Sequence, residues 1–251
     1  MNLKKIVFIS VILNICLFVL SKPISAHPED EFCDQTVSDV LLCSELAELD
    51  RTGANFSQLP AIELDRSPVE TLLLYVQLGL DHILPLGLDH LAFVLALILS
   101  ASALRPLLIQ ISVFTMAHSI TLVLGVLNIV VLNALWVEVA IALSIAFVAI
   151  ENLFIKTRLA WRALVIFCFG LLHGLGFAGA LSDLGIPNAH FISALVGFNI
   201  GVEIAQLLFG LVVFLLLHKL VKERHFKRFV FIPGNWIVAI AGIYWLVERL
   251  L

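Results

Sequence analysis

The sequence predicts an all-α, polytopic membrane protein with six transmembrane helices. Of its 251 residues, 61% are hydrophobic and only 14% are charged, whereas a soluble domain would carry about 25% charged residues. The apolar residues come in blocks long enough to cross a bilayer, which takes about 20 residues each. A transmembrane β-barrel is not expected, because its strands would alternate polar and apolar positions over about 10 residues.

The first 26 residues have the order of a secretory signal peptide. Lys4 and Lys5 precede an apolar stretch over 6–20, and small or polar residues with one proline follow as far as Ala26. This order predicts removal of residues 1–26, with His27 as the first mature residue. An uncleaved anchor is the alternative, although the apolar stretch is short for a membrane span.

Residues 27–67 are polar and acidic and hold too few apolar side chains to build a core, so we expect a short periplasmic arm. Its two cysteines, Cys33 and Cys43, would lie in an oxidising compartment and predict a local disulfide. Of the remaining cysteines, Cys16 leaves with the signal peptide and Cys168 lies within a predicted span.

The transmembrane domain is predicted over 68–251 and begins with a broken segment. Ser67 is suited to cap a helix, with Pro68 in the first turn and Glu70 completing a capping box. The apolar run that follows is too long for one span and too short for two, and Pro85 interrupts it by removing a backbone donor. We therefore expect an interfacial or re-entrant helix at about 68–82 and the first span at about 86–104.

Five further spans are predicted at 107–127, 134–155, 162–182, 191–217 and 229–250. Lys and Arg gather at Arg105 and in the connections at 156–162 and 218–228, whereas 128–133 and 183–190 contain neither residue type. By the positive-inside rule, the basic connections lie in the cytoplasm. Both ends of the mature chain are then expected on the periplasmic side of a bacterial inner membrane.

Ionisable side chains within the apolar segments are the candidate functional residues. The tetrapeptide Gly-Leu-Asp-His occurs twice, at 79–82 and 87–90, and further polar groups follow in the later spans. An ionisable group near the bilayer centre costs about 3 kcal/mol on insertion scales, so each needs a partner, a cavity or an ion. Imidazole with carboxylate suits Ni²⁺, Zn²⁺, Cu²⁺ or Co²⁺. The candidate metal-binding residues are His82, Asp89, His90, His118, His173, Asn199, Glu203 and Glu151.

Two pairs of glycines are expected to bring some of these residues together. The pairs at 170–174 and 197–201 have the GxxxG spacing that lets two helix backbones approach closely. We expect the fourth and fifth spans to meet there and to bring His173 toward Glu203. Glu151 is expected nearer the cytoplasmic side, because it stands at the inner end of the third span.

Five blocks of sequence carry a family resemblance. They are His-Ile-Leu-Pro-Leu-Gly-Leu-Asp-His-Leu-Ala-Phe at 82–93, Phe-Thr-Met-Ala-His-Ser-Ile-Thr-Leu at 114–122, Ile-Glu-Asn at 150–152, Phe-Gly-Leu-Leu-His-Gly-Leu-Gly-Phe-Ala at 169–178 and Phe-Asn-Ile-Gly-Val-Glu-Ile-Ala-Gln at 198–206. Together they resemble the HupE/UreJ family of hydrogenase and urease accessory membrane proteins, in its branch that carries a signal peptide. The resemblance implies a secondary permease for nickel or cobalt that serves metalloenzyme maturation.

The predicted function is a secondary transporter that moves a divalent transition metal, first of all nickel, from the periplasm inward. The expected path enters at His82, Asp89 and His90, continues to a central set and leaves past Glu151 and Asn152. The central set is His118, His173, Asn199 and Glu203. No phosphate-binding loop occurs, so ATP hydrolysis by this chain is not expected.

No enzymatic activity and no tightly bound cofactor are expected, since the metal is the transported substrate, with cobalt or zinc as alternatives to nickel. The other partner is the lipid bilayer; nucleic acid is not expected, and a homo-oligomer is left open. Two rival functions also stay open. One is an intramembrane zinc hydrolase in which three His hold the metal and Asp89 or Glu203 is the base, and the other is a haem-binding electron carrier with in-span His ligands.

Overall fold

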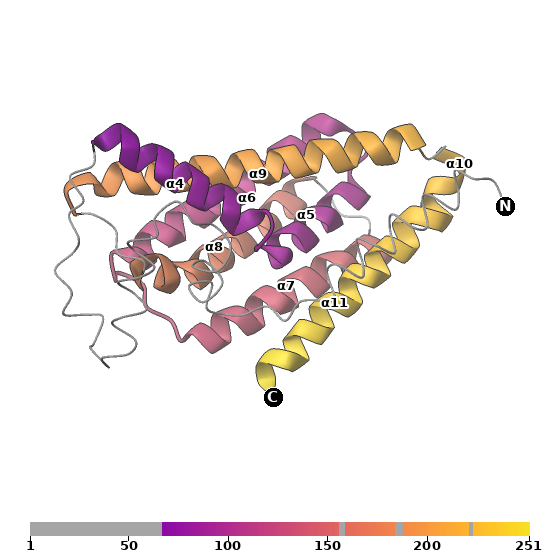
Figure 1. The fold of residues 1–251 in the computed structure, drawn as a ribbon. Coiled ribbons are helices and arrows are strands. Elements are labelled where there is room, and N and C mark those ends of the chain that lie inside the picture. Colours follow the sequence, from indigo (N-terminus) through magenta and orange to yellow (C-terminus); the bar gives the residue numbers. More distant parts are fainter. Residues whose placement is uncertain (1–66, 156–158, 184–187, 221–222) are drawn as a thin grey trace.

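The computed structural model describes residues 67–155, 159–183, 188–220 and 223–251, and every regular element within them is a helix (Figure 1). The predicted all-α class is thereby confirmed. The signal peptide, the periplasmic arm and the Cys33–Cys43 pair lie outside the described residues. In chain order the helices are α4 (Pro68–Ile83), α5 (Leu88–Ser100), α6 (Leu104–Val126), α7 (Ala134–Phe154), α8 (Leu159–Asp183), α9 (Phe191–Leu220), α10 (Glu223–Phe226) and α11 (Ile232–Leu250), with a short 3₁₀ turn at Asn188–His190 and a π-helical segment at Lys227–Phe231.

Five of the described helices, α6, α7, α8, α9 and α11 with its preceding π-helical segment, are long and apolar enough to cross a membrane. Helices α4 and α5 reach that length and apolar character only as a pair, bent by 70° at the break between them, and the total is six if the pair counts as one span. The break predicted at Pro85 is confirmed. The helix after it is shorter than predicted, because 13 residues extend only about 20 Å at 1.5 Å per residue, less than the roughly 30 Å of a hydrocarbon core.

The start of α4 is the predicted cap. The Ser67 hydroxyl oxygen accepts the backbone N–H of Glu70 at 3.3 Å, and the Glu70 carboxylate accepts the backbone N–H of Ser67 at 2.7 Å. Two N–H groups that a helix start leaves without partners are thus satisfied reciprocally. Helix α6 begins earlier than predicted, at Leu104 rather than at 107. Pro106 therefore lies inside its first turn, where a proline costs no helix hydrogen bond.

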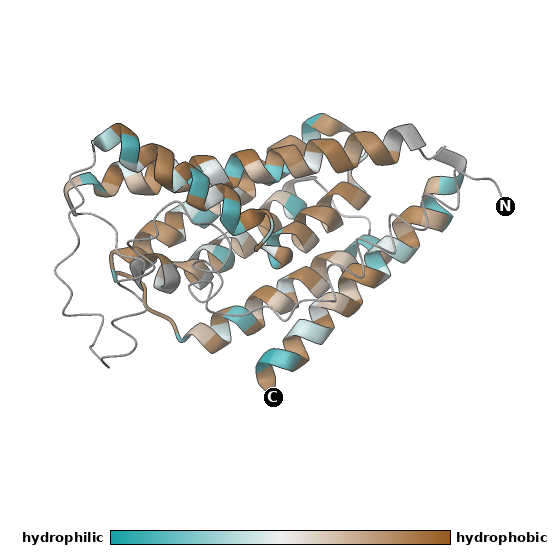
Figure 2. Ribbon diagram, viewed as in Figure 1, coloured by the Kyte–Doolittle hydropathy of each residue, from teal (hydrophilic) through white to brown (hydrophobic). Residues whose placement is uncertain are grey.

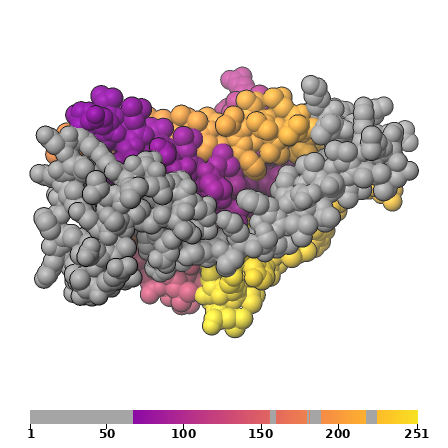
Figure 3. All heavy atoms as spheres, viewed as in Figure 1, coloured from indigo at the N-terminus to yellow at the C-terminus, as the bar shows by residue number. Residues whose placement is uncertain are grey.

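Helix α5 lies at the centre of the bundle. Ten of its 13 residues are buried, and it packs against α7, α9 and α11 (Figure 1). Helices α4, α9 and α11 reach the surface on the face drawn in Figure 3. Figure 2 shows that most of the described helices are apolar along their length. On α9, exposed apolar side chains recur every three to four residues at Ile200, Ile204, Leu208, Leu211 and Leu215, which is one continuous stripe suited to lipid.

The two GxxxG pairs do bring backbones into contact, but the partners are not those predicted. A Cβ built on Gly174 would lie 2.1 Å from the carbonyl oxygen of His118 on α6, and one on Gly201 would lie 2.1 Å from that of Val76 on α4. The expectation that these glycines join the fourth and fifth spans to each other is therefore wrong. The spacing predicts a close approach, but the direction of each glycine face decides which helix is approached.

We expect a Gly201→Ala variant to lower the thermal unfolding temperature of the purified protein, because the added methyl group would overlap the α4 backbone. Forcing such a group into a packed interface typically costs about 1–3 kcal/mol. Gly179→Ala is the matched control, since nothing lies within 4 Å of a Cβ built there. Equal unfolding temperatures for the two variants would show that α4 and α9 do not pack this closely.

Candidate metal site

Four buried or partly buried histidines from four different helices meet in the interior. His82 comes from the last turn of α4, His90 from the first turn of α5, His118 from α6 and His173 from α8. The ring centroids of His90 lie 5.0 Å from those of His82 and His173 and 5.5 Å from that of His118. We call these four residues the histidine cluster. Because α5 is central, its first turn places His90 between the other three rings.

The histidine cluster carries an unusual number of ring nitrogens without partners. His118 is fully buried, and neither of its two ring nitrogens has a hydrogen-bonding partner within the described part of the chain. The same holds for Nε2 of His82, Nε2 of His90 and Nδ1 of His173. Leaving a buried polar group unpaired costs about 1–3 kcal/mol each. Unpartnered nitrogens gathered in one apolar cluster are suited to a ligand that accepts several lone pairs at once.

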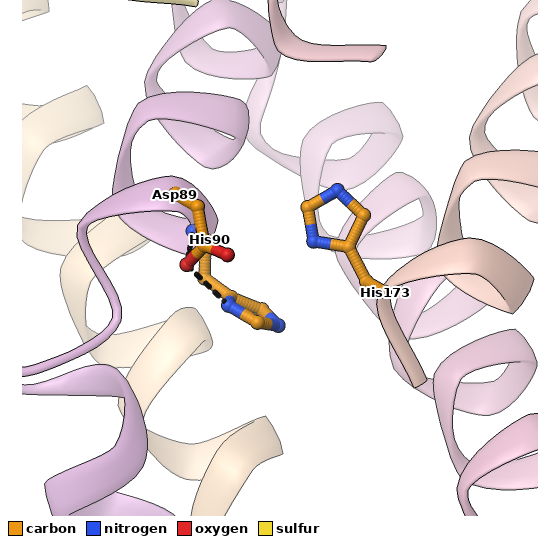
Figure 4. Close-up of side chains that lie close together, drawn as sticks. All are labelled: Asp89, His90 and His173. Atoms are coloured by element: carbon orange, nitrogen blue, oxygen red, sulfur yellow. Dashed lines mark hydrogen bonds and ion pairs between the residues drawn. The ribbon is translucent and has the colours of Figure 1, made fainter. Parts of the chain in front are cut away.

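Asp89 supplies a carboxylate to the cluster. Its Oδ1 accepts a hydrogen bond from the backbone N–H of His90 at 2.7 Å and lies 2.9 Å from Nδ1 of the His90 ring. One ligand atom from each of Asp89, His90 and His173 lies within 4.8 Å of the other two (Figure 4). In metal-binding histidines, the ring nitrogen that does not bind the metal commonly donates a hydrogen bond to a carboxylate.

The broken helix is what allows this arrangement. Residues 84–87 separate α4 from α5, so the last turn of one helix and the first turn of the other lie at the same place. Gly87 is required there because a Cβ would come within 2.4 Å of the carbonyl oxygen of His82. The C-terminal end of α4 also carries the negative end of a helix dipole, which favours a cation beside His82.

Phenylalanine rings close around the histidine cluster. The Phe177 ring centroid lies 3.9 Å from that of His82, and those of Phe114 and Phe93 lie 5.0 and 5.4 Å from that of His173. Phe93 and Phe114 are fully buried. Such surroundings exclude water and strengthen the attraction between a metal ion and its ligands. These rings stand in the same sequence blocks as the histidines, but their role was not predicted.

Asn199 and Glu203 lie elsewhere, in a groove of about 570 Å³ between α6 and α9. The Ser112 hydroxyl donates to Oε1 of Glu203 at 2.6 Å, and the Ser119 hydroxyl donates to Oδ1 of Asn199. Among the described residues, no hydrogen bond or ion pair joins either side chain to the histidine cluster. The structure thus gives these two residues hydrogen-bonding partners outside the histidine cluster, and their role as metal ligands stays a prediction.

Glu151 belongs to a second polar cluster at the end of α7. Trp161 donates to its Oε1 at 3.2 Å, and Nη1 of Arg162 lies 3.9 Å from its Oε2. Arg162 also donates to Asn152 at 2.7 Å and to Gln110 at 3.2 Å. From the sequence, Arg162 was expected only as one of the charges of the cytoplasmic connection at 156–162. The shortness of the connection between α7 and α8 could have predicted this contact, because a short connection places the last turn of one helix beside the first turn of the next.

Fold and site together define a multi-pass helical membrane protein with a buried cluster of four histidines and one carboxylate. Residues 59–249 match the family model described as HupE / UreJ protein, and the chain belongs to the HupE/UreJ family. No curated protein and no solved structure matches the chain. The family is a transporter or accessory family rather than an enzyme family and suggests a role in metal transport or as an accessory protein.

Proposed function

We propose that this protein is a secondary transporter for a divalent transition metal, with nickel as the expected cargo, and that it supplies metalloenzyme maturation. The observation that carries the proposal is the set of unpartnered ring nitrogens in the histidine cluster, together with the Asp89 carboxylate among them. Family membership supports a metal as the cargo.

The donor set favours a borderline transition metal. Imidazole nitrogens suit Ni²⁺, Co²⁺ and Zn²⁺, whereas Mg²⁺ and Ca²⁺ prefer oxygen ligands and Cu(I) prefers sulfur. The only cysteine in the described residues, Cys168, is exposed, and Met116 is also exposed and lines the groove between α6 and α9. Neither sulfur therefore supports a copper(I) route through the cluster.

The broken helix supports transport rather than permanent binding. Interrupted helices in secondary transporters bring helix ends and side chains to a site within the membrane, where they replace the hydration shell of an ion. His118 and His173 lie about halfway along α6 and α8, roughly 20 Å from the start of each helix at 1.5 Å per residue. We propose that the ion enters past His82 and is held by the cluster and Asp89. With the orientation that the basic connections predict, entry is from the periplasm of the inner membrane.

Uptake of labelled nickel into liposomes that contain the purified protein tests this function. We expect saturable uptake by the wild-type protein and at least a tenfold loss in a His173→Ala variant, because His173 is buried within the cluster. His225→Ala is the matched control, since His225 lies outside the cluster and its ring is near Phe229. Equal uptake by wild type and His173→Ala contradicts the proposal. Tight nickel binding without uptake would contradict transport and favour an accessory role.

A further inference from the structure

Ser144 is a fully buried residue of α7 that lies behind one histidine of the cluster. Its hydroxyl donates to the backbone carbonyl oxygen of Ile141 at 2.7 Å, and its Oγ lies 3.2 Å from Nε2 of His173. Among the described side chains of α7, it is the one that hydrogen-bonds to the histidine cluster. The cluster itself contains no residue from α7.

The two distances decide how the protons are arranged. A serine hydroxyl has a single proton, and 2.7 Å is the usual length of an O–H···O bond, so the hydroxyl uses that proton to donate to the Ile141 carbonyl oxygen. Serines in helices commonly make this bond to the preceding turn. The Ser144 oxygen is then left as an acceptor, and the Nε2 atom of His173 must be the donor.

A neutral imidazole carries one N–H, so a proton on Nε2 leaves a lone pair on Nδ1 of His173. That atom is buried and has no hydrogen-bonding partner among the described residues. In Figure 4 the His173 ring stands opposite Asp89 and His90, with the nitrogen next to its attachment point turned toward them. The lone pair therefore faces the other residues of the site.

His90 shows the complementary arrangement. An ionised carboxylate can only accept, so Asp89 Oδ1 at 2.9 Å requires a proton on Nδ1 of His90 and leaves the lone pair on its Nε2. This Nε2 also has no hydrogen-bonding partner in the described ranges. The centroids of the two rings are 5.0 Å apart. His173 thus presents the lone pair of Nδ1, and His90 that of Nε2, to the space between them.

We propose that Ser144 is a positioning residue for metal transport: it fixes the tautomer and orientation of His173 so that Nδ1 is the metal-binding atom, opposite Nε2 of His90. This inference rests on the proposed function, because it concerns the same site. Partners of this kind typically change metal affinity 10- to 100-fold when they are removed. Helix α7 contributes no metal ligand, but through Ser144 it becomes part of the site.

The first experiment needs no metal. In protein labelled with ¹⁵N in the histidine rings, nitrogen chemical shifts distinguish the two neutral tautomers. The His173 signal, assigned by its loss in His173→Ala, is expected to show a protonated Nε2 in the metal-free wild type. In Ser144→Ala it is expected to change to the other tautomer or to a mixture, whereas Ser144→Thr retains the hydroxyl and the wild-type signal. An unchanged tautomer in Ser144→Ala overturns the proposal.

The second experiment measures nickel affinity by calorimetry on the same detergent-solubilised proteins. Ser144→Ala is expected to bind nickel about 10- to 100-fold more weakly, and Ser144→Thr is expected to restore most of that affinity. Ser100→Ala is the matched control, because the Ser100 hydroxyl donates to the Leu97 carbonyl of its own helix and, within the described ranges, to nothing else. Wild-type affinity in Ser144→Ala overturns the positioning role. Absence of nickel binding by the wild type, with the expected tautomer present, would overturn the proposed function and leave the tautomer assignment supported.

Discussion

Replacing Asp89 by alanine is expected to reduce nickel uptake by more than tenfold. The Asp89 Oδ1 atom lies 2.9 Å from Nδ1 of the His90 ring. Among the described residues, Asp89 is the only carboxylate in a group whose ligand atoms, together with those of His90 and His173, lie close enough to hold one metal ion. The variant would lose both the orientation of His90 and the negative charge that offsets a divalent ion. Orienting partners of this kind are typically worth 10- to 100-fold in metal affinity. Uptake and calorimetric affinity measure the effect.

Asp81→Ala is the matched control, because Asp81 stands in the first copy of the same Gly-Leu-Asp-His sequence. Asp81 is only partly buried, and it is not in the group of metal-ligand spacing, so we expect a mild change. Asp89→Asn separates the two contributions of Asp89, since an amide oxygen still accepts the His90 hydrogen bonds but carries no charge. Equal losses in Asp81→Ala and Asp89→Ala would show that the two copies act alike.

Replacing Glu151 by alanine is expected to destabilise the protein by about 3–5 kcal/mol, because this leaves the Arg162 charge buried without its partner. The side chains of Arg162 and Glu151 are only 11% and 2% exposed. Thermal unfolding in detergent measures the loss. A double variant, Glu151→Leu with Arg162→Met, is expected to recover much of the stability, because it removes both charges from the interior.

Nickel affinity separates this structural role from the exit role that the sequence suggested for Glu151. Among the described residues, no hydrogen bond joins the polar cluster around Glu151 to the histidine cluster. The folded Glu151→Ala protein is therefore expected to bind nickel as the wild type does. A Glu151→Gln variant with wild-type unfolding temperature and abolished uptake would instead place this carboxylate on the path of the ion.

The helices were largely predictable, because the length of an apolar run sets how much of the chain a membrane-spanning helix takes up. The last five predicted spans coincide with the observed helices to within a few residues, and the Ser67–Glu70 capping box is present. The extent of α5 was not predictable. Ten of its 13 residues are buried, and burial in protein removes the requirement that a helix match the thickness of the bilayer.

Contact between particular helices was the weaker part of the prediction. The GxxxG spacing at 170–174 and 197–201 correctly indicated close backbones, but the two pairs face α6 and α4 rather than each other. Asn199 and Glu203 stand four residues apart on one face of α9. That face turns toward Ser112 and Ser119 of α6, because the rotation of α9 follows from packing along its whole length.

The sequence by itself determined that this chain is a multi-pass membrane protein and that its interior holds more ionisable groups than packing requires, because burial in an apolar medium gives each such group a cost that demands a partner. Only the tertiary structure decided which groups share a site. It gives Glu203 and Glu151 the partners Ser112 and Arg162, joins Asp89 to His90, and places Ser144 behind His173. Helix rotation and the bend between α4 and α5 set these contacts, and both arise from packing among segments far apart in the chain.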